Sequence, residues 1–164
     1  MGITSMSHQP GTQKYWVGLQ SGGIAIYNHK TGNLSYTGQN IEKEPAIELF
    51  GPKISFTHSF FDSKSRLWFE SWGPGFSYCM QYDPKRKINA LQQFEFITTL
   101  KTYHELYGFM EQRNGRVWVT GLQVLGFFNE GQNKFELIPN NFKAEQGIVY
   151  QTATSLYEDR ENNV

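Results

Sequence analysis

The side chains that most often catalyse reactions or bind metals are few in this sequence and stand far apart. Its four histidines are separated by 21, 29 and 46 residues, so no two have the short spacing of zinc ligands within one motif. The sequence also lacks a Gly-x-Ser-x-Gly motif, a phosphate-binding loop and an Asp-rich calcium loop. We therefore expect no catalytic residue, no metal site and no cofactor, and we interpret the histidines as turn or surface residues: His8, His29, His58 and His104.

Three aspartates and the single cysteine have simple structural interpretations. Asp62, Asp83 and Asp159 fall at turn positions, where a carboxylate can bind nearby backbone amides. This interpretation is favoured over a paired acid/base site. Cys79 lies within FSYCMQYD, where no base stands beside it in the sequence, so we predict a buried structural thiol. One cysteine excludes an intrachain disulfide and a zinc site built from several cysteines.

One segment, FESWGPGFSY at residues 69–78, has the composition of a binding loop. Trp72 stands in a turn that Pro74 stiffens, with Glu70 and Tyr78 on either side. An aromatic ring on a loop can stack on the apolar face of a sugar, and the flanking polar groups can bind hydroxyls. Packing of Trp72 over the adjacent sheet is the favoured interpretation. The alternative is a ligand-binding or partner-binding set made of Trp72, Glu70 and Tyr78.

These residues belong to a repeat that is anchored on tryptophan. Trp16, Trp68 and Trp118 are spaced 52 and 50 residues apart. Each follows a short segment with a turn, and each begins an alternating segment that leads to another turn. A third segment then ends in an aromatic residue, and a turn and a last short segment follow. Units of four short strands and about 50 residues indicate the blades of a β-propeller.

The sequence therefore predicts an all-β protein, a β-propeller fragment of about three four-stranded antiparallel blades plus the first strand of a fourth. The expected blades span about residues 3–40, 54–97 and 104–140, and the further strand lies within about 150–164. Two segments with some helical character fall between units and are expected to be irregular: AIELF near Ala46, and TTLKTYHELYGF near Leu106.

Aromatic anchors are expected to fill the layers between blades. One small sheet cannot bury both of its faces, so neighbouring blades must stack. The tryptophans and the aromatic residues that end the third strands are suited to this layer: Trp16, Trp68, Trp118, Tyr27, Tyr82 and Phe128.

The composition of the chain argues against several classes of function. Fifteen basic and fifteen acidic residues give a formal net charge of zero, which disfavours binding to nucleic acid or to anionic membranes. No apolar run approaches the roughly 20 residues that span a bilayer, so direct membrane insertion is not expected. The first residues have neither the basic nor the apolar region of a signal peptide.

Three segments resemble the two-component regulator propeller repeat: YWVGLQSGGIAIYNHKTGNLSYTG, FMEQRNGRVWVTG and SLYEDRENNV. The middle unit departs from the pattern, because Glu70 replaces a glycine and Trp72 is an additional aromatic residue. The resemblance implies the periplasmic sensor region of a membrane-anchored hybrid two-component histidine kinase of Bacteroidetes. It further implies recognition of a glycan or its breakdown product. The kinase itself is absent from this sequence.

The leading hypothesis is thus a non-catalytic sensing module. One alternative is a propeller enzyme that resembles the streptogramin lyases, and another is a protein–protein scaffold like the WD-repeat proteins. Three blades do not close a propeller, so the expected partners are the remaining blades of a longer parent or a second copy of the chain. The ending TATSLYEDRENNV is interpreted as the start of a fourth blade. Ser155 to Asp159 should form a strand only if another segment pairs with it.

Overall fold

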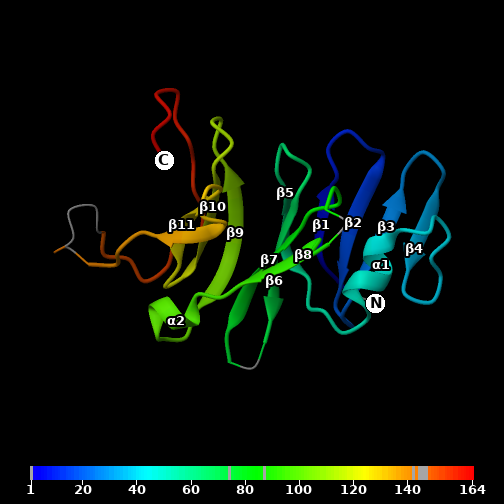
Figure 1. Ribbon diagram of the computed structural model, residues 1–164, viewed down its shortest axis with the longest axis horizontal. Helices are drawn as coiled ribbons and strands as arrows, with labels where there is room; N and C mark the ends of the chain where they lie inside the picture. Colours follow the sequence, from blue (N-terminus) through cyan, green and yellow to red (C-terminus); the bar gives the residue numbers. More distant parts are fainter. Residues whose placement is uncertain (1, 74, 87, 142, 144–147) are drawn as a thin grey trace.

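The protein consists of three four-stranded antiparallel sheets arranged in a row, as the computed structural model shows (Figure 1). The structure describes residues 2–73, 75–86, 88–141, 143 and 148–164. In each sheet the strands follow one another in sequence order. The predicted architecture, an all-β fragment with three four-stranded antiparallel blades, is confirmed.

Each sheet is a simple meander. Sheet 1 contains β1 (Ile3–His8), β2 (Lys14–Leu19), β3 (Ile24–Asn28) and β4 (Asn33–Tyr36). Sheet 2 contains β5 (Thr57–Phe61), β6 (Leu67–Trp72), β7 (Ser77–Tyr82) and β8 (Leu91–Phe94). Sheet 3 contains β9 (Glu105–Glu111), β10 (Val117–Leu122), β11 (Leu125–Asn129) and β12 (Lys134–Leu137).

Two glycines in the β2–β3 turn are required by the approach of the second sheet. Gly22 and Gly23 have φ values of 91° and 78°, a left-handed conformation that residues with a Cβ rarely adopt. A Cβ on Gly22 would also lie 2.6 Å from the carbonyl oxygen of Pro52, in the segment that leads into sheet 2. The turn therefore serves both the hairpin and the contact between the two sheets.

Aromatic residues form the layers between the sheets. The ring of Trp16 lies 5.6 Å from Phe61 and 5.5 Å from Tyr82, both in sheet 2. The buried ring of Trp68 lies 4.9 Å from Phe128 in sheet 3. The two layers thus have the same arrangement, in which the tryptophan of one sheet meets the aromatic residue at the end of the third strand in the next sheet.

This arrangement also explains why two of the six anchors do not lie in a core. Tyr27 is 37% exposed, and Trp118 is only partly buried, so the prediction of an inter-blade core position is wrong for both in this chain. Side chains alternate between the two faces of a strand. Tyr27, which corresponds to Tyr82, therefore faces away from sheet 2. Trp118, which corresponds to Trp68, lies on the face of sheet 3 away from sheet 2, where its ring packs on Phe127.

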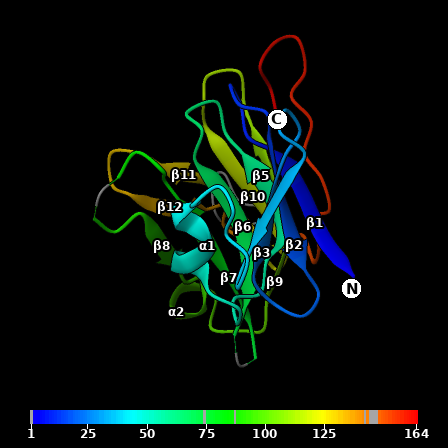
Figure 2. The same ribbon diagram turned by 90° about the vertical axis from the view of Figure 1, so that its right-hand side faces the viewer.

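Two short helices lie between the sheets in the sequence. The helix α1 (Pro45–Phe50) buries Ala46, Ile47 and Phe50 in the core shared by sheets 1 and 2, so the expectation of an irregular segment here is wrong. Pro45 suits the first helical turn, where its missing N–H leaves no hydrogen bond unmade. The second helix, α2 (Ile97–Leu100), precedes sheet 3, and the residues around Leu106 form β9. Seen along the row of sheets, α1 lies on the side of β8 and β12, away from β1 (Figure 2).

The segment 151–163 lies against sheet 3 and has the same first turn as the earlier units. Asp62 Oδ1 accepts hydrogen bonds from the amides two and four residues later, at 3.0 and 2.9 Å. Asp159 Oδ1 does the same at 2.9 and 2.9 Å. Both carboxylates therefore cap a turn, and the two turns are equivalent.

The contacts of this segment with sheet 3 also repeat those of sheet 3 with sheet 2. Glu111 accepts the amide of Ser63 at 2.8 Å, and Glu158 accepts the amide of Arg113 at 2.8 Å. Residues 155–159 nevertheless form no strand in the structure. The expected first strand of a fourth blade is not formed, because a strand needs a hydrogen-bonded neighbour.

The first strands of the sheets lie side by side and form what we call the inner edge (β1, β5 and β9). The Thr4 hydroxyl donates to the carbonyl oxygen of Phe56 at 2.6 Å, and the amide of Ser59 donates to the Ser5 hydroxyl at 2.9 Å. These bonds join β1 to β5 and to the residue before it. The inner edge is therefore a continuous surface that crosses all three sheets.

Candidate functional site

A buried carboxylate lies at the point where sheets 2 and 3 meet on the inner edge. Glu70, on β6, is only 1% exposed. Its Oε2 accepts hydrogen bonds from the Thr57 hydroxyl at 2.7 Å and from His58 Nδ1 at 2.8 Å. Its Oε1 accepts the amide of Leu106, on β9, at 3.3 Å. Three donors from two other strands thus compensate for the burial of one negative charge.

His58 is held by this carboxylate in an uncommon backbone conformation. It has a φ of 46°, and the pairing of β5 with β6 shifts register between Thr57 and Phe60. The hydrogen bond to Glu70 raises the pKa of His58, while partial burial opposes the increase. Its side chain is 45% exposed. When Nδ1 donates to Glu70, Nε2 is left without a hydrogen-bond partner among the described residues.

Two tyrosines and a second glutamate continue the site along β9. The Tyr107 ring lies 6.5 Å from the His58 ring, and the Tyr103 hydroxyl donates to Glu105. The bond to Glu105 raises the pKa of Tyr103, and burial together with Glu105 raises that of Tyr107. We call these five residues the inner-edge cluster: His58, Glu70, Tyr103, Glu105 and Tyr107.

The chemistry of the inner-edge cluster is that of a binding surface. It combines an imidazole donor, a carboxylate acceptor and aromatic rings. The Thr57 hydroxyl bonds to Glu70 and not to His58, so the histidine does not activate it as a nucleophile. No group of three or more potential metal-binding side chains is found among the residues that the structure describes.

The three residues of the FESWGPGFSY segment do not converge on one site. Trp72 is 44% exposed at the end of β6, whereas Glu70 is buried under His58. Tyr78 pairs with Ser71, which lies between Glu70 and Trp72 on β6 and faces the opposite side of sheet 2 from both. Tyr78 therefore packs at the edge of the core shared with sheet 1. Pro74 lies outside the described residues. Of the three, only Glu70 belongs to the inner-edge cluster.

Two other candidates for chemistry are buried. Cys79 is fully buried, and burial raises the pKa of its thiol well above the ordinary value. His104 is also fully buried: its ring stacks on Phe76 at 5.6 Å, and Nε2 lies 3.2 Å from the carbonyl oxygen of Ser77. The interpretation as a turn or surface residue is therefore wrong for His104. The sequence did not indicate this packing role, because the contacting residues Phe76 and Ser77 lie far from His104 along the chain.

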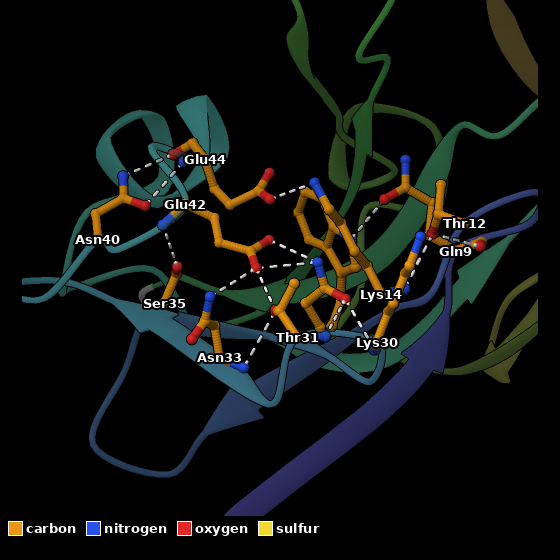
Figure 3. A network of polar contacts seen from close by, with 12 residues as sticks. Gln9, Thr12, Lys14, Lys30, Thr31, Asn33, Ser35, Asn40, Glu42 and Glu44 are labelled. Atoms are coloured by element: carbon orange, nitrogen blue, oxygen red, sulfur yellow. Dashed lines mark hydrogen bonds and ion pairs between the residues drawn. The ribbon is translucent and has the colours of Figure 1, made fainter.

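The remaining polar networks hold the architecture together. Arg66 is buried, donates to Asp62 at 2.7 Å within sheet 2 and binds both carboxylate oxygens of Glu130 in sheet 3 at 3.0 and 2.6 Å. Beside sheet 1, the Glu42 carboxylate accepts hydrogen bonds from Asn28, Thr31 and Asn33 (Figure 3). The amide of Glu42 donates to the Ser35 hydroxyl. The bond from Asn28 contributes most to lowering the pKa of Glu42. This network joins the segment before α1 to β3 and β4.

Comparison with solved structures identifies the fold. The chain superposes on the extracellular domain assigned to the one-component system BT4673 from B. thetaiotaomicron, with a TM-score of 0.63 and 15% sequence identity. It has the fold of a part of that domain. The match covers 99% of this chain but only 20% of the solved chain. A second structure, the extracellular domain assigned to the hybrid two-component system BT4673, matches with a TM-score of 0.49 and 14% identity, over 99% of this chain and 25% of that one.

The sequence itself gives no comparable match. No protein-family model matches it, and no curated protein does. Among the described residues, no helix is both long and apolar enough to cross a membrane.

Proposed function

We propose that this chain is part of an extracellular, non-catalytic sensor domain of a one-component or hybrid two-component signalling system. The observation that supports this proposal is the match of nearly the whole chain to the extracellular domain of such a system. The repeats named above resemble those of the same class of sensor. The inner-edge cluster adds a surface suited to binding, in which the Thr57 hydroxyl bonds to Glu70 and not to His58.

The ligand class follows from the same proposal. The sensor recognises a glycan or a breakdown product of one, in the periplasm or outside the cell, as part of a membrane-anchored parent. The side chains that support this ligand are the aromatic rings and hydrogen-bonding groups of the inner-edge cluster.

The proposed partners are the remaining blades of a longer parent or a second copy of the chain. The face of sheet 1 that is turned away from sheet 2 carries exposed apolar side chains: Ile3, Met6, Tyr27 and Leu34. Apolar surface of this kind is usually covered by another protein surface.

Calorimetric titration with oligosaccharides released from starch, xylan, arabinan and pectic galactan tests the proposal. The expected result is saturable binding of at least one of them, with the recovered sugar chemically unchanged after prolonged incubation. Formation of a product would identify an enzyme and contradict the sensor. The absence of binding to every preparation would contradict the glycan ligand.

A further inference from the structure

We propose that the inner-edge cluster is the ligand site, and that it takes a neutral polyhydroxylated molecule of the saccharide class. In this site His58 donates a hydrogen bond from Nε2, Glu105 accepts from a ligand hydroxyl, and the Tyr107 ring packs on the ligand between them. The inference rests on the proposed sensing function, and it assigns that function to the inner edge instead of to the loop that carries Trp72.

The Glu70–His58 pair of sheet 2 has no counterpart in sheets 1 and 3. Glu70 pairs with Thr57 on the first strand of sheet 2. At the corresponding position, sheet 1 has Gly18, and sheet 3 has Thr120. A buried carboxylate is therefore not needed to build a sheet of this protein or to pack one sheet against another. The Glu70–His58 pair is particular to one place on the inner edge.

The Glu70–His58 pair requires the burial of a charge, and it leaves one imidazole nitrogen as an exposed donor. A fully buried carboxylate loses its hydration, and His58 has a φ of 46°, a region that is uncommon for residues with a side chain but in which histidine is enriched. Such features persist in proteins chiefly at functional sites. Here both fix the imidazole with Nδ1 toward the interior, so that Nε2 remains for an external acceptor. The raised pKa of His58 keeps the ring a donor at both nitrogens to higher pH.

Charge at the site selects a neutral ligand. The cluster contains two glutamates against one histidine, so an anionic ligand would meet a local excess of negative charge. A hydroxyl group can both accept from His58 and donate to Glu105. The aromatic rings of Tyr103 and Tyr107 supply apolar surface for the carbon-bound hydrogens of a sugar. Vicinal hydroxyls on a sugar ring satisfy all of these contacts.

The test compares matched variants, with the same four oligosaccharide preparations as probes. His58→Asn removes the imidazole, and with it the outward Nε2 donor, but retains a residue that tolerates a left-handed backbone. Tyr107→Ala removes the ring that packs on the ligand and should weaken binding as well. We expect His58→Asn to raise the dissociation constant about tenfold or more, which is typical for loss of a hydrogen bond to a charged group. Trp72→Ala and the exposed control His29→Asn are expected to stay within about twofold of the unaltered protein.

Nuclear magnetic resonance gives a second readout in the unaltered protein. Addition of a bound oligosaccharide should shift the imidazole signals of His58 more than the indole signal of Trp72. If calorimetry detects binding but His58→Asn and Tyr107→Ala bind normally, the inner-edge site is wrong while the sensing function stands. The same conclusion follows if only Trp72→Ala loses binding. If none of the preparations binds and none shifts the His58 signals, both the glycan ligand and this site are rejected.

Discussion

At the level of single residues, buried charges in this protein are each held by several hydrogen bonds. Asp62 is fully buried, and its carboxylate binds Arg66 and the indole N–H of Trp68, at 2.7 and 2.9 Å. Glu70 likewise accepts hydrogen bonds from donors on β5 and β9. The roles differ, however, because Asp62 binds amides of its own turn and two buried side chains, whereas Glu70 orients an imidazole that reaches the surface.

Replacement of Asp62 by alanine should therefore destabilise the protein strongly. It leaves the buried Trp68 indole N–H without an acceptor and the Arg66 guanidinium with Glu130 alone, and the loss of a buried hydrogen-bond partner typically costs about 1–3 kcal/mol. Asp159→Ala is the matched control, because Asp159 caps an equivalent turn that is exposed to solvent. Chemical denaturation of both variants measures the difference. Equal losses of stability would show that the turn, and not the buried pair, determines the effect.

At the level of the elements, the helix α1 fills the outer part of the layer between sheets 1 and 2. Its length of six residues gives little intrinsic stability, since isolated helices this short are not stable in water. Its stability comes instead from packing: the Phe50 ring lies 5.3 Å from both Phe69 and Tyr82. The helix is stabilised because its apolar side chains fill the space between sheets 1 and 2.

Truncation of this side chain tests that explanation. Phe50→Ala should lower the free energy of unfolding by about 3–5 kcal/mol, because it removes a buried ring and leaves a cavity between two sheets. Leu49→Ala, on the same helix but largely exposed, should have an effect of less than about 1 kcal/mol. Urea denaturation followed by fluorescence provides the comparison. A similar loss for Leu49→Ala would contradict this explanation, because alanine forms helices better than leucine and the burial of Phe50 between the sheets would then not be what distinguishes the two positions.

The elements also show what the sequence could predict and why. The tryptophan spacing and the alternation around it predicted twelve strands in three sheets, because these signals are local and recur in each unit. The helix α1 was missed, since the sheets that stabilise it lie on either side of it in the sequence. The inner-edge cluster was missed for a similar reason: His58, Glu70 and Tyr107 come from three strands, and only Glu70 was noticeable as a departure from the repeat. The exposure of Tyr27 depends on which blades are present, and a repeat pattern does not contain that information.

At the level of the whole molecule, the row of sheets ends in two faces that resemble the buried layers. On sheet 3, Trp118 and Arg116 occupy the positions that Trp68 and Arg66 occupy on sheet 2. Arg66 binds Glu130 across the buried layer, whereas Arg116 lies over Phe127 of its own sheet. A surface that covers this face should thus bring an aromatic ring to Trp118 and a carboxylate to Arg116.

A fusion protein tests whether a further sheet can form there. Val164 follows a turn equivalent to the one that precedes Val117, so a second copy of residues 118–138 joined after Val164 would supply three more strands in the correct register. This copy brings its own Phe128 to Trp118 and its own Glu130 to Arg116. We expect residues 155–159 to become a strand, with amide hydrogen exchange slowed at least about tenfold, because they would then have a hydrogen-bonded neighbour.

The control fusion carries Phe128→Ser and Glu130→Lys in the second copy only. It has the same length and the same strand sequence elsewhere, but it lacks the ring and reverses the charge that should meet Arg116. Its residues 155–159 should exchange as fast as those of the unfused chain, and its Trp118 fluorescence should remain that of a partly exposed indole. Equal protection in both fusions would show that added backbone alone forms the strand, and that the aromatic and charged contacts seen between sheets 2 and 3 do not select the neighbouring sheet.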